Sequence, residues 1–435
     1  FSALAIDARE QAVREAAEAQ AVQPFDLEQG PLLRVSLLRL ASDEHVLLLT
    51  LHHIVSDGWS MNVLIEEFTR CYDAFALGKN PALAPLPVQY ADYALWQRRW
   101  LEAGEQARQL SYWQDVLGNE HDPLELPTDH PRPALPSQRG RRLEFAIDTA
   151  LADGLRELAR QHNVTLFMLL LGAFNVLLLR YTGQTDLRVG VPIANRNRSE
   201  IEGLIGFFVN TLVLRTQVDA LQPFASLLQT VKERVLGAQA HQDLPFEQLV
   251  EALQPERSLS HTPLFQVMYN HQPHVADMAS LQTAAGLSLS AVQWQSRTTQ
   301  FDLTLDTYEQ GGQLRGALTY ADELFDAATI ARMAKHFTGL LAALVADPNQ
   351  RVGELALLAD EERDTLISGW NQTAQAYPLD QCLHSLIGEQ VQRTPDAPAV
   401  RFAEQTLSYA ALERRANQLA NLLRERGVGP DVLVG

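Results

Sequence analysis

Cysteine, lysine and positive charge in general are scarce in this sequence. The two cysteines, Cys71 and Cys382, lie far apart and lack the spacing of a metal site. We therefore expect free thiols in a reducing compartment, the cytoplasm. Acidic side chains number 53 against 35 basic ones, and the formal net charge is -18. This acidic excess argues against a partner with a phosphate surface, either nucleic acid or an anionic membrane.

Long apolar runs and phosphate-binding loops are also missing. The most hydrophobic stretch, residues 166–179, is too short to span a bilayer and contains Asn175, so it predicts a buried core helix. No glycine-rich loop occurs, so nothing indicates ATP binding. The 435 residues are 46% hydrophobic and 20% charged, which is typical of a globular protein with two or three domains.

The stretch from His52 to Ser60, HHIVSDGWS, concentrates the groups that can carry chemistry. Residues 46–51 before it are apolar and branched, which predicts a buried strand. Apolar residues in 61–75 recur every three or four positions and predict a helix with one apolar face, for which Ser60 is a plausible N-cap. A strand-to-helix junction is a rigid place from which side chains can reach a substrate.

Each residue of this stretch has a chemical and a structural interpretation. If the strand continues through His52 and His53, the two rings point to opposite sides, so that one can face a cleft. Asp57 can orient a histidine or pair with a distant arginine. Gly58 allows a bend or the close approach of a substrate. The alternative is that these side chains only pack inside the protein.

The remaining pattern predicts a mixture of helices and strands. We expect a hairpin over 32–40 and 45–53, an irregular proline-rich segment at 123–136, and a second hairpin, 301–308 with 313–320, turning at Gly311 and Gly312. Helices are expected at 8–21, 150–162, 165–180, 224–241 and 326–345, and strands at 143–147, 187–193 and 399–402.

The stretch resembles the His-His-x-x-x-Asp-Gly motif of the condensation domains of nonribosomal peptide synthetases and of their chloramphenicol acetyltransferase relatives. The run SDGWS resembles the subtype that joins an L-configured donor to an L-configured acceptor. Other segments are similar to family motifs in the same order, namely 24–27, 90–97, 205–212, 244–247 and 263–267, and the tail resembles the opening of an amino-acid adenylation domain.

The resemblance implies an α+β fold (an α/β sandwich) of two chloramphenicol acetyltransferase-like lobes with the active site between them. The implied domains are an incomplete N-terminal lobe (1–130), a C-terminal lobe (131–347), a linker (348–380) and the start of an adenylation domain (381–435). Because the family has further residues ahead of Phe1, we expect residues 1–435 alone to have little condensation activity.

The implied reaction is attack of an acceptor aminoacyl-thioester amine on a donor thioester. The implied catalytic residues are His53, which orients the amine or takes its proton, together with His52, Asp57 and Gly58. Asp57 is expected to pair with Arg196 in the second lobe, although Arg196 can equally be a solvated loop residue. Trp59 and Ser60 are expected to line the substrate tunnel, or Trp59 to pack. Asn210 receives no role.

The implied substrates arrive on the phosphopantetheine arms of donor and acceptor peptidyl carrier proteins. No tightly bound cofactor and no metal is expected, and the adjoining adenylation domain is a further partner. Three other functions stay open: an epimerisation domain, a coenzyme A-dependent acyltransferase, and an inactive condensation-like platform that recruits a tailoring enzyme.

Overall fold

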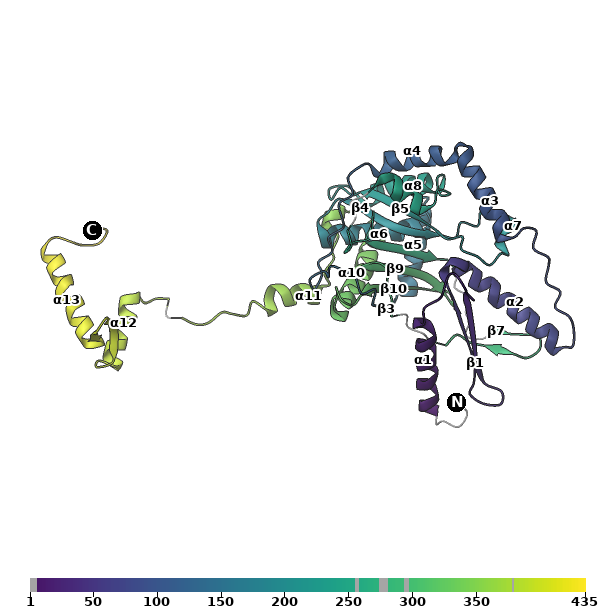
Figure 1. Cartoon of the computed structure of the whole chain (residues 1–435). Coiled ribbons are helices and arrows are strands. Elements are labelled where there is room, and N and C mark those ends of the chain that lie inside the picture. Colours follow the sequence, from purple (N-terminus) through teal and green to yellow (C-terminus); the bar gives the residue numbers. More distant parts are fainter. Residues whose placement is uncertain (1–5, 255–257, 274–280, 293–296, 378) are drawn as a thin grey trace. The chain divides into compact units, whose positions relative to one another are not determined.

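The computed structural model describes residues 6–254, 258–273, 281–292, 297–377 and 379–435. Pro378, in the predicted linker, lies outside the described residues. The chain divides into two compact units, Phe1–Ala359 and Asp360–Gly435. Figure 1 shows the elements of each unit.

A six-stranded sheet forms the centre of the first unit. Its strands are β3 (Gly140–Ala146), β4 (Asp186–Ile193), β5 (Asn210–Gln217), β6 (Val267–Gln272), β9 (Leu303–Gln310) and β10 (Gln313–Ala321). They lie in the order β3-β10-β9-β6-β4-β5, and β6 runs parallel to β4 and β9 while the other pairs are antiparallel. Gly311 and Gly312, with φ of 57° and 78°, make the tight turn from β9 to β10, which confirms the predicted hairpin.

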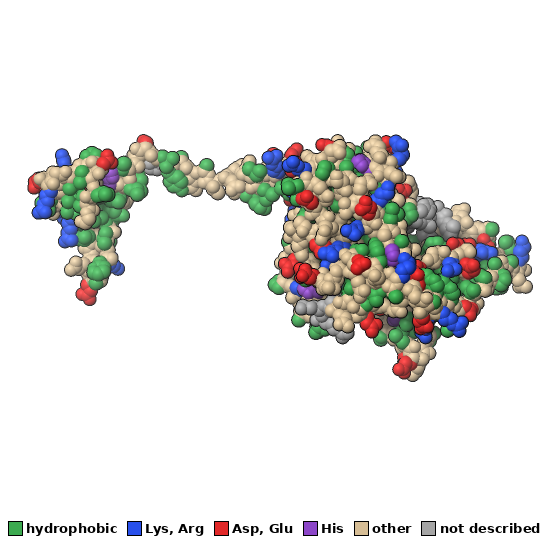
Figure 2. Space-filling model, turned by 90° about the horizontal axis from the view of Figure 1, so that it is seen from above, with side chains coloured by type: hydrophobic (Ala, Val, Ile, Leu, Met, Phe, Trp, Pro, Cys, Tyr) green, Lys and Arg blue, Asp and Glu red, His purple; other side chains and the backbone are tan. Residues whose placement is uncertain are grey.

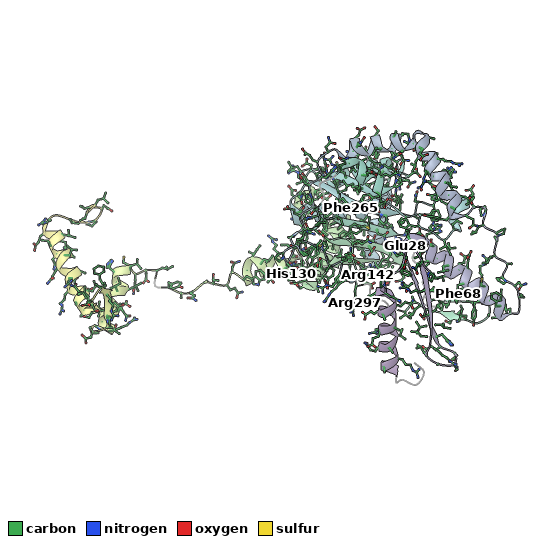
Figure 3. The ribbon with its side chains drawn as sticks, in the orientation of Figure 1. Glu28, Phe68, His130, Arg142, Phe265 and Arg297 are labelled. Carbon is green, nitrogen blue, oxygen red and sulfur yellow. The ribbon has the colours of Figure 1, made fainter. Side chains whose placement is uncertain are left out.

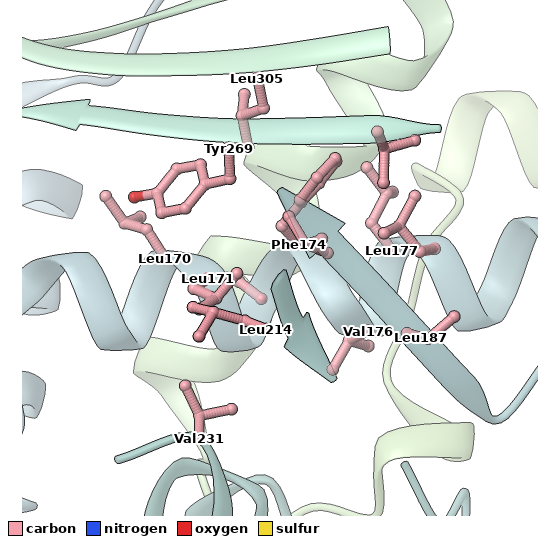
Figure 4. Close-up of a cluster of buried hydrophobic side chains, with 14 of the residues drawn as sticks. Leu170, Leu171, Phe174, Val176, Leu177, Leu187, Leu214, Val231, Tyr269 and Leu305 are labelled. Carbon is pink, nitrogen blue, oxygen red and sulfur yellow. The ribbon is translucent and has the colours of Figure 1, made fainter. Parts of the chain in front are cut away.

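Helices cover one face of this sheet and bury its apolar side chains. They are α5 (Thr149–Gln161), α6 (Leu166–Thr182), α8 (Phe224–Gln239) and α10 (Ala327–Ala346), and α9 (Phe246–Leu253) packs against β5. Helix α6 is apolar on all sides because it lies between other helices and the sheet, as the sequence predicted. Figure 4 shows Phe174 of α6 beside Tyr269 of β6, with ring centroids 6.3 Å apart.

The other face of the sheet carries polar side chains across β3, β10 and β9. Neighbouring residues of a strand point to opposite faces, so Asp306 points away from the buried Leu305. Its carboxylate accepts a hydrogen bond from Asn270 at 3.2 Å and forms an ion pair with Arg142 of β3, which is labelled in Figure 3. Helices packed on one face of a mostly antiparallel sheet agree with the expected α+β class.

The first lobe consists of α1 (Ile6–Val22), the hairpin of β1 (Leu33–Arg39) and β2 (His45–Leu51), and α2 (Gly58–Ala76). The hairpin was predicted, but β2 ends at Leu51, before the two histidines. Residues His53–Val55 form a 3-10 turn, η1, instead. The strand-based argument for the directions of the two rings therefore does not hold.

A hairpin of the second lobe reaches across to this first lobe. It is formed by β7 (Leu281–Gln282) and β8 (Ser288–Leu289), and its turn lies against α2. The carboxylate of Asp73 in α2 accepts the backbone N–H groups of Ala284 and Ala285 at 2.9 and 3.0 Å. The lobes are thus joined at this end of α2 as well as at the histidine motif.

The chain enters the core of the second lobe earlier than residue 130, the boundary expected from the sequence. Helix α3 (Tyr90–Trp100) continues through η2 (Leu101–Glu105), where Gly104 has a φ of 117°, into α4 (Gln106–Leu117). Trp113 and Leu117 of α4 are 2% and 0% exposed and belong to the core of the second lobe. Arg215 of β5 donates hydrogen bonds to the last carbonyl groups of α4.

The first part of the predicted linker also packs against this core. It includes the turn η4 (Val352–Glu354); Val352 is fully buried and its N–H donates to the carbonyl of Gln222 at 2.9 Å. Arg180 of α6 donates to the carbonyl of Leu355 at 2.6 Å. Residues 348–355 are therefore held in the first unit.

The second unit contains two helical segments before a small helix-and-hairpin group. Its elements are α11 (Asp360–Asp364), η5 (Thr365–Gly369), α12 (Leu383–Arg393), β11 (Pro398–Phe402), β12 (Gln405–Ser408) and α13 (Tyr409–Glu425). The predicted strand at 399–402 is confirmed, and α13 ends just before Gly427, whose φ is 86°.

Charges of both signs alternate on one face of the larger unit. The face in Figure 2 carries acidic and basic side chains interspersed over the larger unit. Among the described residues, no helix alone has the length and apolar composition to cross a membrane, although α5 and α6 would pass together as a pair bent by 104°.

Candidate active site

The histidine motif lies on the turn between β2 and α2. The ring nitrogen Nδ1 of His52 accepts the N–H of Ile54 at 3.1 Å, which fixes the start of the 3-10 turn. The ring of His52 lies edge-on to Phe25, and the ring of His53 lies edge-on to Phe207. The two histidines therefore have different neighbours. His53 is exposed, and within the described part of the chain no hydrogen bond is made to its ring.

Asp57, rather than Ser60, is the N-cap of α2. Its Oδ1 accepts the N–H of Ser60 at 2.8 Å, and Gly58 is the first helical residue. The prediction of Ser60 as the cap was wrong because the aspartate at position 57 already accepts a free N–H of the first turn, that of Ser60 itself. The helix consequently begins directly after the motif's carboxylate.

Arg196 approaches Asp57 from the second lobe. It follows the end of β4, after Asn195 has reversed the chain with a φ of 52°. Its Nη2 lies 3.2 Å from Oδ1 and 3.4 Å from Oδ2 of Asp57, and 1% and 3% of the two side chains are exposed. Its Nη1 donates to the carbonyls of Ile201 and Leu204, both at 2.7 Å. The predicted ion pair is confirmed, and the solvated-loop interpretation of Arg196 is wrong.

Ser60 is the third member of this buried group. Its hydroxyl lies 2.7 Å from Oδ1 of Asp57, 2.9 Å from Nη2 of Arg196 and 2.9 Å from the carbonyl oxygen of Gly206. It is 0% exposed. The expectation that Ser60 lines a substrate tunnel was wrong, because every side of its hydroxyl faces protein. We call Asp57, Ser60 and Arg196 the interlobe cluster.

The interlobe cluster holds residues 206–208, which sequence reasoning left without a role. The N–H of Gly206 donates to Ser60 Oγ at 3.1 Å, and the N–H of Phe208 donates to Asp57 Oδ2 at 3.0 Å. Between them, the carbonyl of Phe207 accepts the hydroxyl of Tyr90 at 2.7 Å. The only sequence signal was that 90–97 and 205–212 both resemble family motifs.

The surroundings of Asp57 keep its carboxylate ionised. Burial by itself opposes the charge, but hydrogen bonds from the side chain and N–H of Ser60 and from the N–H of Phe208, with the charge of Arg196, outweigh it and lower the pKa of Asp57. All of these partners are inside the protein. Asp57 is therefore suited to holding structure, and it has no free side from which to exchange a proton with a substrate.

The remaining predicted residues occupy distinct places. Trp59 is 42% exposed, donates its Nε1–H to the carbonyl of Glu202 at 2.9 Å at the end of α7 (Ser199–Glu202), and lines a groove of about 480 Å³ between α2, α7 and residues 83–87. A methyl group added to Gly58 would meet no atom within 4 Å.

Asn210 fixes the backbone just before α9. Its amide nitrogen donates to the carbonyl of Leu244, and its amide oxygen accepts the N–H of Phe246.

Among the described residues, no group of three or more histidine, cysteine or carboxylate side chains is placed to hold a metal ion. The site instead combines one exposed imidazole with a buried ionic cluster that bridges two lobes.

The Condensation domain family matches residues 1–367, which is most of the chain. This chain belongs to that family. The AMP-binding enzyme family matches residues 387–435, after the condensation domain.

Similar proteins are components of nonribosomal peptide synthetases. A linear gramicidin synthase protein of Brevibacillus parabrevis is 46% identical over 427 residues, and chondramide synthase cmdD of Chondromyces crocatus is 46% identical over 431. Each comparison covers 98% of this chain but only 8% and 11% of the relative, so the chain spans a small part of the length of these proteins.

Solved structures agree with the family and its fold. A four-domain nonribosomal peptide synthetase, holo-AB3403 bound to AMP and glycine, matches with a TM-score of 0.84 at 27% identity, over 98% of this chain and 32% of that one. The X-domain in its complex with OxyB from teicoplanin biosynthesis matches with a TM-score of 0.74 at 30% identity, over 81% and 78%. The condensation domain thus has the expected α+β fold of two chloramphenicol acetyltransferase-like lobes.

Proposed function

We propose that this condensation domain forms a peptide bond between two thioester-bound substrates, in the subtype that joins an L-configured donor to an L-configured acceptor. The observation that carries the proposal is the contrast between His53 and Asp57. Both carboxylate oxygens of Asp57 accept hydrogen bonds from inside the protein. The His53 ring, in contrast, is exposed and makes no hydrogen bond with the described residues. A substrate proton can therefore be exchanged with His53 and not with Asp57.

The reaction needs positioning more than it needs a strong base. Free α-amines have a pKa of about 7.7–8.0, so an appreciable fraction of the acceptor amine is neutral near pH 7. The amine nitrogen bonds to the donor carbonyl carbon, the carbon–sulfur bond breaks, and the proton lost from nitrogen balances the thiol that leaves. Holding the amine and the thioester in attack geometry can supply several kcal/mol, and His53 fits that task together with proton transfer.

We assign His52 the supporting role. Its Nδ1 accepts the N–H of Ile54, so the neutral ring carries its N–H on Nε2. The ring also packs against Phe25. His52 therefore stabilises the turn that carries His53, and its own ring is held by contacts within the protein.

The proposed substrates are aminoacyl or peptidyl groups on the phosphopantetheine arms of donor and acceptor carrier proteins. The similarity to synthetase proteins and the AMP-binding match after residue 387 support an adenylation domain as neighbour. We also propose a cytoplasmic location, supported by the two free cysteines.

A thioester-to-thioester condensation assay tests this proposal. The intact synthetase module is combined with a donor carrier protein loaded with an aminoacyl group, and the acceptor carrier is analysed for the dipeptidyl thioester. Product on the acceptor is the expected result. Inversion of a loaded residue without transfer would indicate an epimerisation domain, and binding of carriers or enzymes without either product would indicate a recruiting platform. The likeness to the X-domain complex gives that platform its support.

The open space at Gly58 leads to a prediction about substrate access. Gly58 has neither a close neighbour nor a left-handed backbone, so the fold itself does not require glycine there. We expect Gly58→Leu to lower condensation while the melting temperature stays near that of the parent. The matched control is Gly339→Leu in α10, where the space is equally open and turnover should not change. If Gly58→Leu turns over substrate at the parent rate, the space beside Gly58 is not needed for substrate access.

A further inference from the structure

The His53 ring contacts an aromatic ring of the other lobe, that of Phe207. The ring centroids of His53 and Phe207 are 5.1 Å apart and the planes meet at 88°, the edge-to-face arrangement that aromatic rings favour. No hydrogen bond from the described residues holds the imidazole, so this ring contact is a restraint on its rotation.

The backbone that carries Phe207 is fixed on both sides. Gly206 is bonded to Ser60 through its N–H and its carbonyl, at 3.1 and 2.9 Å, and Phe208 donates to Asp57. The carbonyl of Phe207 itself accepts the hydroxyl of Tyr90. A side chain at Gly206 would overlap the ring of Tyr90, whose nearest atom would lie 2.4 Å from the added carbon. Phe207 therefore has little freedom to move away from His53.

We propose that Phe207 is a positioning residue for His53, through which the interlobe cluster controls the orientation of the catalytic imidazole. The proposal rests on the proposed condensation activity and adds a route by which a buried ion pair affects chemistry. The ion pair does not touch His53. It holds residues 206–208, and the Phe207 ring in turn holds the imidazole in the orientation that faces the acceptor amine.

The histidine next door offers a matched control. His52 has the same kind of edge-to-face contact, with Phe25 at 5.7 Å, but its Nδ1 is also hydrogen-bonded to Ile54. Removing the Phe25 ring therefore leaves His52 held, whereas removing the Phe207 ring leaves His53 free to rotate. The same substitution should have different consequences at the two positions.

The test compares Phe207→Leu, Phe207→Tyr and Phe25→Leu in the intact synthetase module. Leucine keeps apolar volume and loses the ring, while tyrosine keeps the ring. We expect Phe207→Leu to lower the single-turnover rate constant about tenfold or more, because a misplaced reacting group loses much of its rate advantage. The KM for the acceptor carrier should change little. Phe207→Tyr and Phe25→Leu should stay close to the parent, and all three should melt near the parent temperature.

A second readout does not depend on turnover. Loss of the Phe207 ring should change the three-bond NMR couplings that report the χ1 rotamer of His53, assigned with His53→Gln, and Phe25→Leu should leave them unchanged. Couplings are measured because the chemical shifts would change through loss of the Phe207 ring current alone. Unchanged His53 couplings in Phe207→Leu overturn the proposal, and so does the parent rate in that variant. If the parent itself forms no peptide bond, the proposed function fails, and the couplings alone then decide whether Phe207 positions His53.

Discussion

Replacing His53 with alanine should remove nearly all condensation and leave the domain folded. The ring is exposed and receives no hydrogen bond from the described residues, so its removal takes little from the folded state. Proton transfer by a positioned side chain contributes typically 10²–10⁴-fold to a rate, so we expect a loss of about 100-fold or more. Single-turnover transfer between carrier proteins measures the rate, and thermal melting checks the fold.

The control for this variant is His45→Ala. His45 is also an exposed histidine, and it begins the strand that leads to the motif. It should retain parent turnover. If His53→Ala keeps near-normal turnover as well, His53 has no catalytic role and the exchange of the amine proton must occur with solvent.

Breaking the ion pair between Asp57 and Arg196 should destabilise the first unit severely. Either Asp57→Ala or Arg196→Ala leaves the other charge buried without its partner, at a cost of about 3–5 kcal/mol. Denaturant unfolding measures the free energy of each variant. Arg160→Ala is the matched control, because its pair with Glu157 is largely exposed and such pairs contribute about 0–1 kcal/mol. Melting of Asp57→Ala at the parent temperature would show that the pair is not structural.

The same pair predicts how stability depends on pH. The pKa of Asp57 is lower in the folded protein than its ordinary value of 3.8. Its contribution is therefore complete above that ordinary value and is lost as the pH falls below it towards the folded-state pKa. The stability advantage of the parent over Asp57→Asn should be constant near neutral pH and shrink below about pH 4. An advantage that stays constant into that acidic range would contradict this assignment.

The sequence predicted the elements well where hydrophobic pattern or composition dominates. Helix α6 is apolar on every side, and its burial follows from composition alone. The hairpins follow from paired apolar runs and from two glycines. The lobe boundary and the linker were less predictable, because Trp113 and Val352 lie in stretches of mixed composition and become buried only through long-range packing.

The site was predictable as a set of residues but not as an arrangement. Periodicity cannot distinguish Asp57 from Ser60 as a cap, since both residue types cap helices and the choice depends on where the first turn closes. Asn210 bonds to a backbone carbonyl and Phe207 packs against a ring, both distant in sequence, and no local pattern indicates which partners they will meet. The pairing of Asp57 with Arg196 came from the family resemblance and not from spacing.

The interlobe cluster has a consequence for the order in which a ribosome makes this protein. The hydrogen bonds that hold the Asp57 side chain against the second lobe come from residues up to 151 positions later, at Phe208. During synthesis the histidine motif leaves the ribosome long before those partners exist. Contacts so distant in sequence form late, because a long loop must close first. The nascent first lobe therefore carries the histidine motif before the contacts that position it have formed.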